Sequence, residues 1–234
     1  MICDRHRPTT FDGVVGNAAD VRLCQRLTER ALVDGDPLVV LLTGPSGIGK
    51  STLAGIMALA VAGDARRVTT VASGELTGTR MRELAPRLLP PDCPVLFPAP
   101  PEALIIEEVD TAKPEAQKLL LTILETLRPY TLVAMTSNVG PGKLFAGAYA
   151  MKFKRRPHCI ELSTRDLVSI GGEPGPAPKL LKRIMESEGL NGHDADWYRG
   201  FMENHRDKRG AMILGNIGLA INEVYTEALK GSAS

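Results

Sequence analysis

The sequence predicts an α/β protein in which a parallel sheet of five strands is flanked by helices and followed by a small all-helical domain. Three observations predict this class. Short apolar runs alternate with helical patterns, one of these runs leads directly into a glycine-rich loop, and only helical patterns remain toward the C-terminus. We therefore expect an α/β domain over residues 1–165 and a helical domain over residues 166–234.

Five apolar runs bounded by turn or polar residues are typical of buried strands. They are Leu38–Leu42, Arg67–Ala72, Ala103–Ile106, Thr131–Met135 and Cys159–Leu162. The segments between them indicate helices, most clearly over Lys50–Ala62 and Pro114–Leu127, where apolar residues recur at helical spacing. Strands that alternate with helices in this way form a parallel sheet that is covered on both faces.

The helical domain begins beyond a segment rich in glycine and proline. Residues 171–178 read GGEPGPAP, a composition that excludes both helix and strand. After it, the spacing of apolar residues predicts three helices: one that ends near Gly189, one over Asp194–His205 and one over about Asp207–Lys230.

Composition excludes several classes of protein. Lys and Arg number 28 against 27 Asp and Glu, so a contact with nucleic acid needs a local basic patch. Aromatic residues make up 4%, which argues against binding by base stacking. The four cysteines lack zinc spacing, and no apolar run is long enough to cross a bilayer. We expect a soluble protein with free thiols in the cytoplasm, or at a nuclear or viral replication site if the source is a eukaryote or its virus.

The glycine-rich loop carries the clearest chemical signal. Residues 44–51 read GPSGIGKS and match the phosphate-loop pattern G-x-x-x-x-G-K-[ST], between a strand and a helix as that pattern requires. Its glycines let backbone N–H groups face a phosphate at a helix N-terminus. Lys50 would reach the β- and γ-phosphates, Ser51 would hold Mg²⁺, and Thr52 would donate to the α-phosphate. The alternative is a glycine-rich turn that only reverses the chain.

Polar side chains follow two of the predicted strands. Glu107 and Glu108 come directly after a buried run, which places carboxylates at the carboxyl edge of the sheet beside the phosphate loop. We assign Glu107 to the metal and Glu108 to polarising a water for attack on the γ-phosphate; a solvated helix cap is the alternative. Asn138 ends the next strand and would orient that water or touch the γ-phosphate, unless it is only a turn residue.

Taken together, these motifs resemble AAA+ ATPases of the sliding-clamp-loader type, especially the small subunits of replication factor C. Residues 7–17, RPTTFDGVVGN, are similar to the family's N-terminal adenine-contacting box, and residues 107–110, EEVD, stand at its acidic motif. Asn138 falls on the sensor-1 position. The run Lys179–Leu190 resembles the first helix of the family's lid, and residues 207–211, DKRGA, resemble its sensor-2 motif.

The resemblance implies a P-loop NTPase of the AAA+ fold, with a lid over residues 166–234 and with ATP and Mg²⁺ as cofactors. The residues expected to bind the nucleotide are Arg7, Val14, Val15, Gly44, Pro45, Ser46, Gly47, Ile48, Gly49, Lys50, Ser51, Thr52 and Arg209. The residues expected to act in catalysis are Lys50, Glu108, Asn138, Arg156 and Arg209, with Ser51 and Glu107 on the metal. Among these, Arg156 or the adjacent Arg155 would be the arginine finger that reaches a neighbouring subunit.

The chain departs from the family pattern in three places. Glu107 replaces the metal-binding Asp, which suggests slower hydrolysis. Residues 155–157 read RRP where the family has Ser-Arg-Cys around the arginine finger. The sequence ends at Ser234, about where the lid ends, so we expect no collar domain.

The resemblance also implies partners. We expect a homo- or hetero-oligomer of AAA+ subunits that acts in DNA replication, contacts duplex or primer–template DNA through its backbone, takes a sliding clamp as a candidate partner and binds no membrane. Arg80 and Arg82 resemble a DNA-facing helix start, with ordinary surface arginines as the alternative. Two other functions stay open, a nucleotide-gated adaptor or helicase-loader-like protein with low turnover and a phosphotransferase. A GTPase is disfavoured because no N-K-x-D motif follows a strand.

Overall fold

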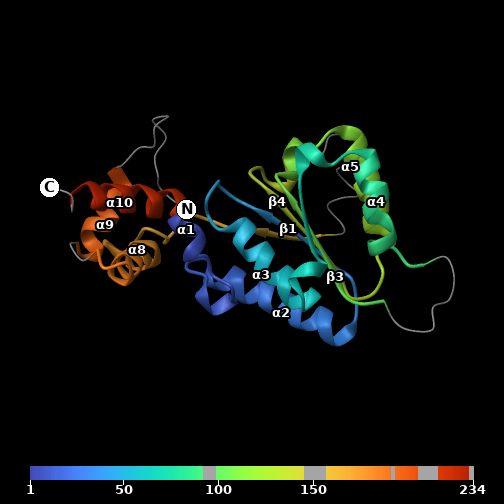
Figure 1. The fold of residues 1–234 in the computed structure, drawn as a ribbon, viewed down its shortest axis with the longest axis horizontal. Coiled ribbons are helices and arrows are strands. Elements are labelled where there is room, and N and C mark those ends of the chain that lie inside the picture. The colour runs from blue at the N-terminus through green and yellow to red at the C-terminus, as the bar shows by residue number, and fades with distance from the viewer. Residues whose placement is uncertain (92–98, 145–156, 191–192, 205–215, 232–234) are drawn as a thin grey trace. The chain divides into compact units, whose positions relative to one another are not determined.

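The computed structural model describes residues 1–91, 99–144, 157–190, 193–204 and 216–231 (Figure 1). The chain divides into two compact units. The α/β unit comprises Ala19–Gly44 and Lys50–Glu161, and the helical unit comprises Met1–Ala18, Pro45–Gly49 and Leu162–Ser234. This division differs from a single boundary at residue 165 because the N-terminal segment and the tip of the phosphate loop contact helices from the C-terminal part of the chain.

Five parallel strands form the sheet of the α/β unit in the order β2-β3-β4-β1-β5. Their bounds are β1 Leu38–Thr43, β2 Val68–Ala72, β3 Glu102–Glu107, β4 Thr131–Ser137 and β5 His158–Glu161. The central strands β1 and β4 are buried along their whole length. Because all the strands run in one direction, their carboxyl ends share one edge, where Thr43 lies in register with Ser137 and Glu161. The predicted parallel sheet is thereby confirmed.

Helices cover both faces of this sheet (Figure 1). They are α2 (Ala18–Asp34), α3 (Lys50–Ala62), α4 (Gly78–Leu88), α5 (Pro114–Glu125) and α6 (Pro141–Leu144), with short 3-10 turns η2 (Ala65–Arg67), η3 (Ser73–Glu75) and η4 (Val109–Thr111). On one face, Met81 of α4 and Leu120 of α5 join Leu104 and Ile106 of β3 in a continuous core. On the other face, α3 packs against β3 and β4.

The long helix α2 was not among the elements predicted from the sequence. Its inward face consists of Val21, Cys24, Thr28 and Ala31, spaced three and four residues apart, so the apolar signal is weak. The Thr28 hydroxyl is satisfied inside the helix, because it donates to the Cys24 carbonyl at 2.8 Å. Burial raises the pKa of the Cys24 thiol from 9.0 to about 12, which keeps this side chain neutral in the core.

The described part of the helical unit contains short and long helices and a small hairpin. Its elements are α1 (Ile2–Arg5), η1 (Phe11–Gly13), β6 (Ser169–Ile170), β7 (Glu173–Pro174), α8 (Pro176–Ser187), α9 (Ala195–Asn204) and α10 (Ile217–Gly231). Leu181 and Met185 of α8 are buried, as are Tyr198 and Met202 of α9. The helix predicted over about 207–230 is described from residue 217 onward, and residues 205–215 lie outside the described ranges.

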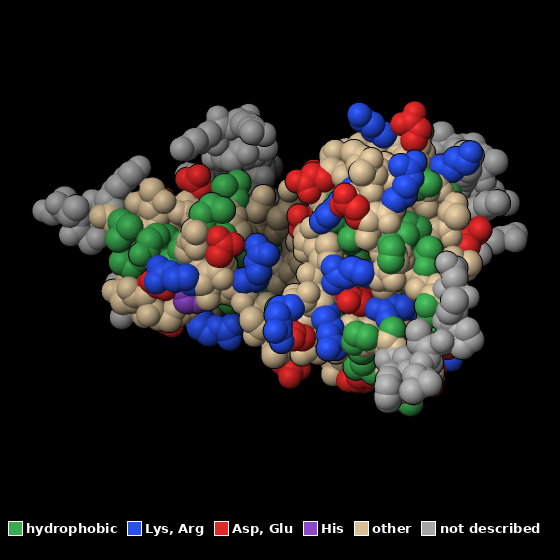
Figure 2. Space-filling view, turned by 45° about the vertical axis from the view of Figure 1, so that its right-hand side comes forward, with side chains coloured by type: hydrophobic (Ala, Val, Ile, Leu, Met, Phe, Trp, Pro, Cys, Tyr) green, Lys and Arg blue, Asp and Glu red, His purple; other side chains and the backbone are tan. Residues whose placement is uncertain are grey.

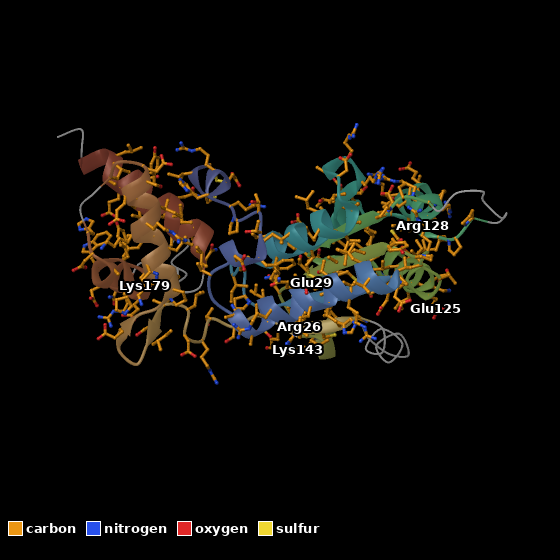
Figure 3. The ribbon with its side chains drawn as sticks, turned by 90° about the horizontal axis from the view of Figure 1, so that it is seen from below. Arg26, Glu29, Glu125, Arg128, Lys143 and Lys179 are labelled. Carbon is orange, nitrogen blue, oxygen red and sulfur yellow. The ribbon has the colours of Figure 1, made fainter. Side chains whose placement is uncertain are left out.

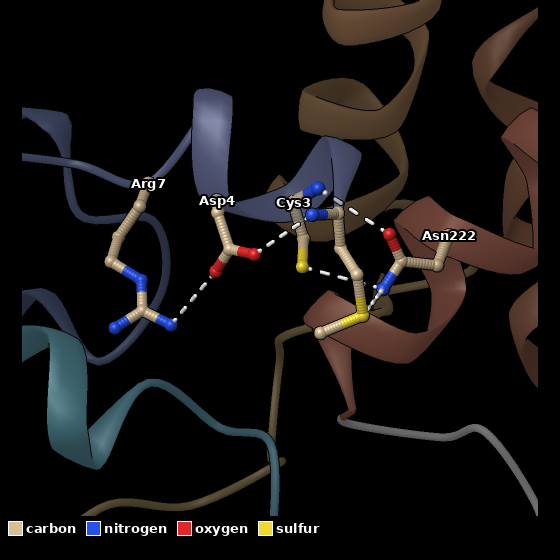
Figure 4. Close-up of polar contacts among 5 residues, drawn as sticks. Cys3, Asp4, Arg7 and Asn222 are labelled. Atoms are coloured by element: carbon tan, nitrogen blue, oxygen red, sulfur yellow. Dashed lines mark hydrogen bonds and ion pairs between the residues drawn. The ribbon is translucent and has the colours of Figure 1, made fainter.

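The N-terminal helix α1 is fastened to the helical unit at two points. The Cys3 backbone N–H donates to Asn222 Oδ1 of α10 at 3.4 Å (Figure 4). Arg5 and His6 both contact Glu188, at 3.0 Å and 2.6 Å, directly after α8. The hydrogen bond from His6, together with the nearby Arg5, holds the pKa of the Glu188 carboxyl below its usual range. These contacts explain why the N-terminal residues belong to this unit.

The segment 171–178 departs from the expectation that it excludes helix and strand. The strands β6 and β7 pair in an antiparallel hairpin, whose turn is made by Gly171 and Gly172 at φ 58° and 91°. Helix α8 then begins at Pro176, so two prolines occupy its first turn. Proline is tolerated there because the first N–H groups of a helix have no partner within the helix.

The surface carries mixed charge. Figure 2 shows basic and acidic side chains interspersed on the face that it presents, in keeping with the formal net charge of +1. Among the helices that the structure describes, none is long and apolar enough to cross a membrane.

Candidate nucleotide site

The phosphate loop connects the end of β1, Thr43, to the first residue of α3, Lys50. Three of its residues have positive φ, namely Gly44 at 140°, Gly47 at 78° and Gly49 at 101°. Side chains rarely adopt this backbone region, so glycine is required at these points. Ile48 is buried while residues 45–47 are exposed, which leaves the tip of the loop open to solvent. Such a curled backbone before a helix N-terminus is an anion-binding geometry.

Within the helical unit, the tip of this loop contacts the start of α10. The Ile217 N–H donates to the Gly47 carbonyl at 3.2 Å, and a Cβ at Gly47 would overlap the Asn216 side chain. Asn216 also caps α10, because its Oδ1 accepts the Leu219 N–H at 3.0 Å. The sequence interpretation missed Asn216. An Asn directly before an apolar helical run is an N-cap signal that points to it.

Lys50 is the best-connected of the predicted site residues in the α/β unit. Its side chain is buried, and its ammonium donates to the Gly44 carbonyl at 2.7 Å and to Asn138 Oδ1 at 2.9 Å. Burial lowers the pKa of the Lys50 ammonium from 10.5, and the negative charges of Asp110 and Glu108 oppose that shift. One cation therefore joins the phosphate loop to the ends of β3 and β4.

The two glutamates at the end of β3 have different surroundings. Glu107 is the last residue of the strand, is partly buried and lies in register with Ala72 of β2. Glu108 follows with an exposed side chain and a left-handed backbone, at φ 55° and ψ 46°. Its N–H donates to Thr136 Oγ1 of β4 at 3.1 Å. The chain thus turns sharply between the two carboxylates and gives each a separate direction.

Asn138 is held from two sides just beyond the end of β4. Its side-chain oxygen accepts from Lys50, and its backbone N–H donates to Asp110 Oδ1 at 3.3 Å. The structure therefore brings Lys50, Asn138 and Glu108 together. The sequence interpretation had offered this position for Asn138 beside the alternative of a turn residue. The structure adds Asp110 and Thr136, to which the sequence interpretation assigned no role.

The remaining predicted residues are less informative. Ser51 and Thr52 lie partly buried in the first turn of α3. Arg7 is exposed in the helical unit and pairs with Asp4 at 3.3 Å (Figure 4), while Val14 and Val15 are partly buried after η1. Arg155, Arg156 and Arg209 lie outside the described residues, so the finger and sensor-2 assignments stay predictions.

The donor set fits magnesium bound with a nucleotide. Among the residues that the structure describes, no group of three or more His, Cys, Asp or Glu side chains could hold a metal unaided. Mg²⁺ at nucleotide sites typically takes one or two protein oxygens and completes its shell with phosphates and water. The Ser51 hydroxyl and the Glu107 carboxylate provide such oxygens at the start of α3 and the end of β3.

Comparison with known proteins agrees with this geometry. Residues 39–145 match the family model of an AAA domain of the dynein-related subfamily. A mutant of RuvB from Thermotoga maritima is structurally similar, with a TM-score of 0.68 and 19% identity over 98% of this chain and 68% of that one. The RuvB Holliday junction branch migration motor from the same organism has a TM-score of 0.57 and 20% identity over 93% and 72% of the two chains. No curated protein matches the sequence significantly.

These likenesses show the fold. The parallel five-stranded sheet, its flanking helices and the loop between β1 and α3 have the P-loop AAA+ fold, which confirms the α/β part of the predicted fold class. The assignment of the C-terminal helices to a lid stays a prediction. The matched segment contains the phosphate loop, both glutamates and Asn138. It therefore supports the prediction of an ATPase domain in this part of the chain.

Proposed function

We propose that this chain binds ATP with Mg²⁺ at residues 44–52 and hydrolyses it. The observation that carries the proposal is the position of the Lys50 ammonium, which bonds to the phosphate loop at Gly44 and to Asn138 and lies in the field of Glu108 and Asp110. A buried cation with exchangeable oxygen partners suits phosphate oxygens, which can take the place of the carbonyl and the carboxamide. The three sequence motifs then serve one reaction.

Each of these residues has a role in phosphoryl transfer to water. Lys50 would neutralise charge on the β- and γ-phosphates, and Asn138 would orient the attacking water. Glu108 would accept a proton from that water, because its side chain is exposed just beyond the strand end. Ser51 and Glu107 would hold Mg²⁺, which supplies charge stabilisation on the phosphates when it is bound.

Glu108→Gln tests this assignment. We expect the variant to bind ATP as tightly as the unmodified chain but to release phosphate more slowly by about 10²-fold or more, because the amide cannot take the proton. Glu115→Gln on α5 is the matched control, since Glu115 is exposed and lies outside the site. Phosphate release by Glu108→Gln at the unmodified rate would contradict the assignment, as would loss of ATP binding in a calorimetric titration.

We further propose that the chain acts on DNA as a subunit of an oligomer. Its support is the clamp-loader resemblance of the N-terminal box, the fold shared with a branch migration motor and the two arginines near the start of α4. In that helix the Arg80 N–H donates to the Thr77 hydroxyl at 3.2 Å, and Arg82 is exposed. A helix start with arginines suits contacts to the DNA backbone without base reading.

Two measurements test the DNA role and the partner arginine. An arginine supplied by a neighbouring subunit is worth roughly 10³- to 10⁵-fold in rate, so turnover per chain should fall on dilution. Turnover that stays flat over a wide dilution series would contradict the arginine finger.

The second measurement compares stimulation of ATP hydrolysis by primer–template DNA, a four-way junction and duplex DNA, each with and without a sliding clamp. Stimulation only by primed DNA with a clamp supports the clamp-loader role in replication, and stimulation by the junction supports a RuvB-like role.

A second candidate function rests on Glu107. This residue ends β3 where the resembled family has Asp, and its longer side chain shifts the metal-binding oxygens. Slow turnover would suit a nucleotide-gated adaptor that binds ATP and a partner. Glu107→Asp separates the two functions. If Glu107→Asp releases phosphate tenfold faster or more, a fall of about 1.4 kcal/mol in barrier height, the unmodified chain is better described as an adaptor. An unchanged or lower rate favours the ATPase.

A further inference from the structure

The ends of β3 and β4 are cross-linked by two reciprocal hydrogen bonds. In one, the Glu108 N–H beyond β3 donates to the Thr136 hydroxyl on β4 at 3.1 Å. In the other, the Asn138 N–H beyond β4 donates to Asp110 Oδ1 in η4, which follows β3, at 3.3 Å. Each segment therefore holds the backbone of a residue whose side chain has a predicted catalytic role. We call this pair of bonds the strand-end brace.

The Thr136 bond acts at a strained position. Glu108 has φ 55°, a left-handed conformation that costs a residue with a side chain free energy unless its surroundings hold it. Thr136 is 2% exposed and lies in a central strand in register with Leu42 of β1, so its hydroxyl has a fixed position. Because the acceptor of the Glu108 N–H is fixed, it determines the backbone position from which the Glu108 side chain projects.

The Asp110 bond acts on the residue that contacts Lys50. Asp110 holds the backbone of Asn138, whose side-chain oxygen accepts from the Lys50 ammonium at 2.9 Å. Asp110 also ranks first among the charges that favour the ammonium form of Lys50. Its carboxylate thus fixes the direction of the Asn138 carboxamide through the backbone.

We propose that Thr136 and Asp110 are positioning residues for ATP hydrolysis, which orient Glu108 and Asn138 through the strand-end brace without touching the nucleotide. The proposal rests on the proposed ATPase function. It predicts that breaking either bond lowers kcat with little change in KM, because the groups that bind the triphosphate remain in place.

Four substitutions test the brace. Thr136→Val keeps the shape and removes the acceptor, whereas Thr136→Ser keeps the hydroxyl. Asp110→Ala removes the acceptor, whereas Asp110→Asn keeps an oxygen that can accept the Asn138 N–H. We expect Thr136→Val and Asp110→Ala to lower kcat by about tenfold each, and the Ser and Asn variants to keep most of the activity. Thr122→Val on α5, whose hydroxyl donates to the Lys118 carbonyl at 3.2 Å, is the control and should leave kcat unchanged.

A purely structural role would give a different pattern. It would lower thermal stability and the amount of active enzyme, and active-site titration with a tight nucleotide analogue corrects for that loss. A corrected kcat that is the same in Thr136→Val as in the unmodified chain would overturn the role of Thr136. A Thr136→Ser variant as slow as Thr136→Val would overturn it too. For Asp110, an unchanged kcat in Asp110→Ala or equal losses in the Ala and Asn variants would overturn the proposal.

Amide hydrogen exchange separates this inference from the ATPase proposal, because it needs no nucleotide. We expect the Glu108 amide to exchange faster in Thr136→Val, and the Asn138 amide to exchange faster in Asp110→Ala but not in Asp110→Asn. Unchanged exchange in all the variants would show that the brace does not hold these residues. If the unmodified chain hydrolyses no ATP, the proposed function fails, while the exchange rates still decide whether the brace orients Glu108 and Asn138.

Discussion

Lys50 and Arg128 are two buried cations at opposite edges of the same parallel sheet. Lys50 follows β1 at the carboxyl edge, whereas Arg128, labelled in Figure 3, precedes β4 at the amino edge. Their side chains belong to residues that are 7% and 6% exposed. Burial lowers the pKa of both side chains. Their partners differ. Arg128 Nε donates to the Arg87 carbonyl at 2.5 Å and its backbone N–H donates to the Leu88 carbonyl at 2.9 Å, both at the end of α4.

We infer from this difference that Arg128 stabilises the fold, whereas Lys50 is placed to bind a ligand. The partners of Arg128 are main-chain carbonyls of a helix end, and the guanidinium fastens that end beside the sheet. Next to it, Arg87 bonds to Glu102 at 2.6 Å, so the carboxylate there already has a cation. Lys50 instead bonds to a glycine-loop carbonyl and a carboxamide, and phosphate oxygens can replace both. A compact ammonium on a flexible stem suits exchangeable partners, and a planar guanidinium suits fixed ones.

Removal of Lys50 gives the largest expected effect on activity. We expect Lys50→Met to lower kcat/KM for ATP by about 10²-fold or more, because a preorganised donor to the phosphates is lost. The thermal midpoint should stay the same or rise, since a buried charge is replaced by an apolar chain of similar length. Phosphate release and thermal unfolding measure the two effects. Lys118→Met, at an exposed position of α5, is the control, and a large drop in stability with unchanged turnover would reverse the comparison.

Removal of Arg128 should lower stability and leave turnover unchanged, the opposite of what we expect for Lys50. We expect Arg128→Met to lower the free energy of unfolding by about 2 kcal/mol, because a charge-assisted hydrogen bond to the end of α4 is lost. Turnover per folded molecule should not change. Denaturant unfolding and active-site titration test both parts, with Arg22→Met on the exposed side of α2 as the control. Turnover that falls while stability holds would assign Arg128 to the chemistry instead.

Measurements at alkaline pH also distinguish Lys50 from Arg128. The pKa of Lys50 lies below 10.5, so its proton is lost as pH rises through that lowered value, and ATP affinity should fall there. Folding stability should change with pH in the opposite direction to ATP affinity. Between the lowered folded-state pKa and 10.5 the unfolded chain binds more protons, so the Lys50 contribution makes stability rise with pH. Arg128 stays charged in this range and contributes no such trend. ATP binding and unfolding measured from pH 7 upward, in the unmodified chain and in Lys50→Met, show whether both trends come from Lys50.

A pair of glycines provides the smallest test. Gly35 at the amino edge has φ 75°, and a Cβ there would lie 3.0 Å from Tyr130 Cζ. We expect Gly35→Ala to lower stability by about 1 kcal/mol with unchanged ATP binding, because the strain falls on a turn remote from the phosphate loop. Gly47→Ala, at φ 78° in the loop, should instead weaken ATP binding. Gly55→Ala inside α3, where a Cβ meets nothing within 4 Å, is the control for both. Weaker ATP binding in Gly35→Ala would contradict the view that the amino edge of the sheet affects stability alone and that ATP binding depends on the carboxyl edge.

Several features could be predicted from residue order because they depend on local spacing. Strands β1, β3 and β4 are buried apolar runs in the sequence, whereas β2 and β5 each bury a single residue and carry a weaker signal. The phosphate loop combines glycines and Lys50 at a spacing that needs no knowledge of distant residues. Helix α2 escaped prediction because only four of its residues face the core, one of them Thr28. The hairpin at 169–174 was not predicted because its two glycines and the nearby prolines have the composition of an irregular loop.

By itself, the sequence determined the α/β fold and predicted where a nucleotide site would lie, since strand ends and loop motifs are properties of neighbouring residues. Only the tertiary structure decided that Asn138 contacts Lys50, that Thr136 holds Glu108, and that Asp110 holds Asn138. These bonds join segments that are far apart in the sequence, and their geometry depends on the register of β3 beside β4 and of β4 beside β1. Register is set by packing across the whole sheet, so no single stretch of sequence contains it.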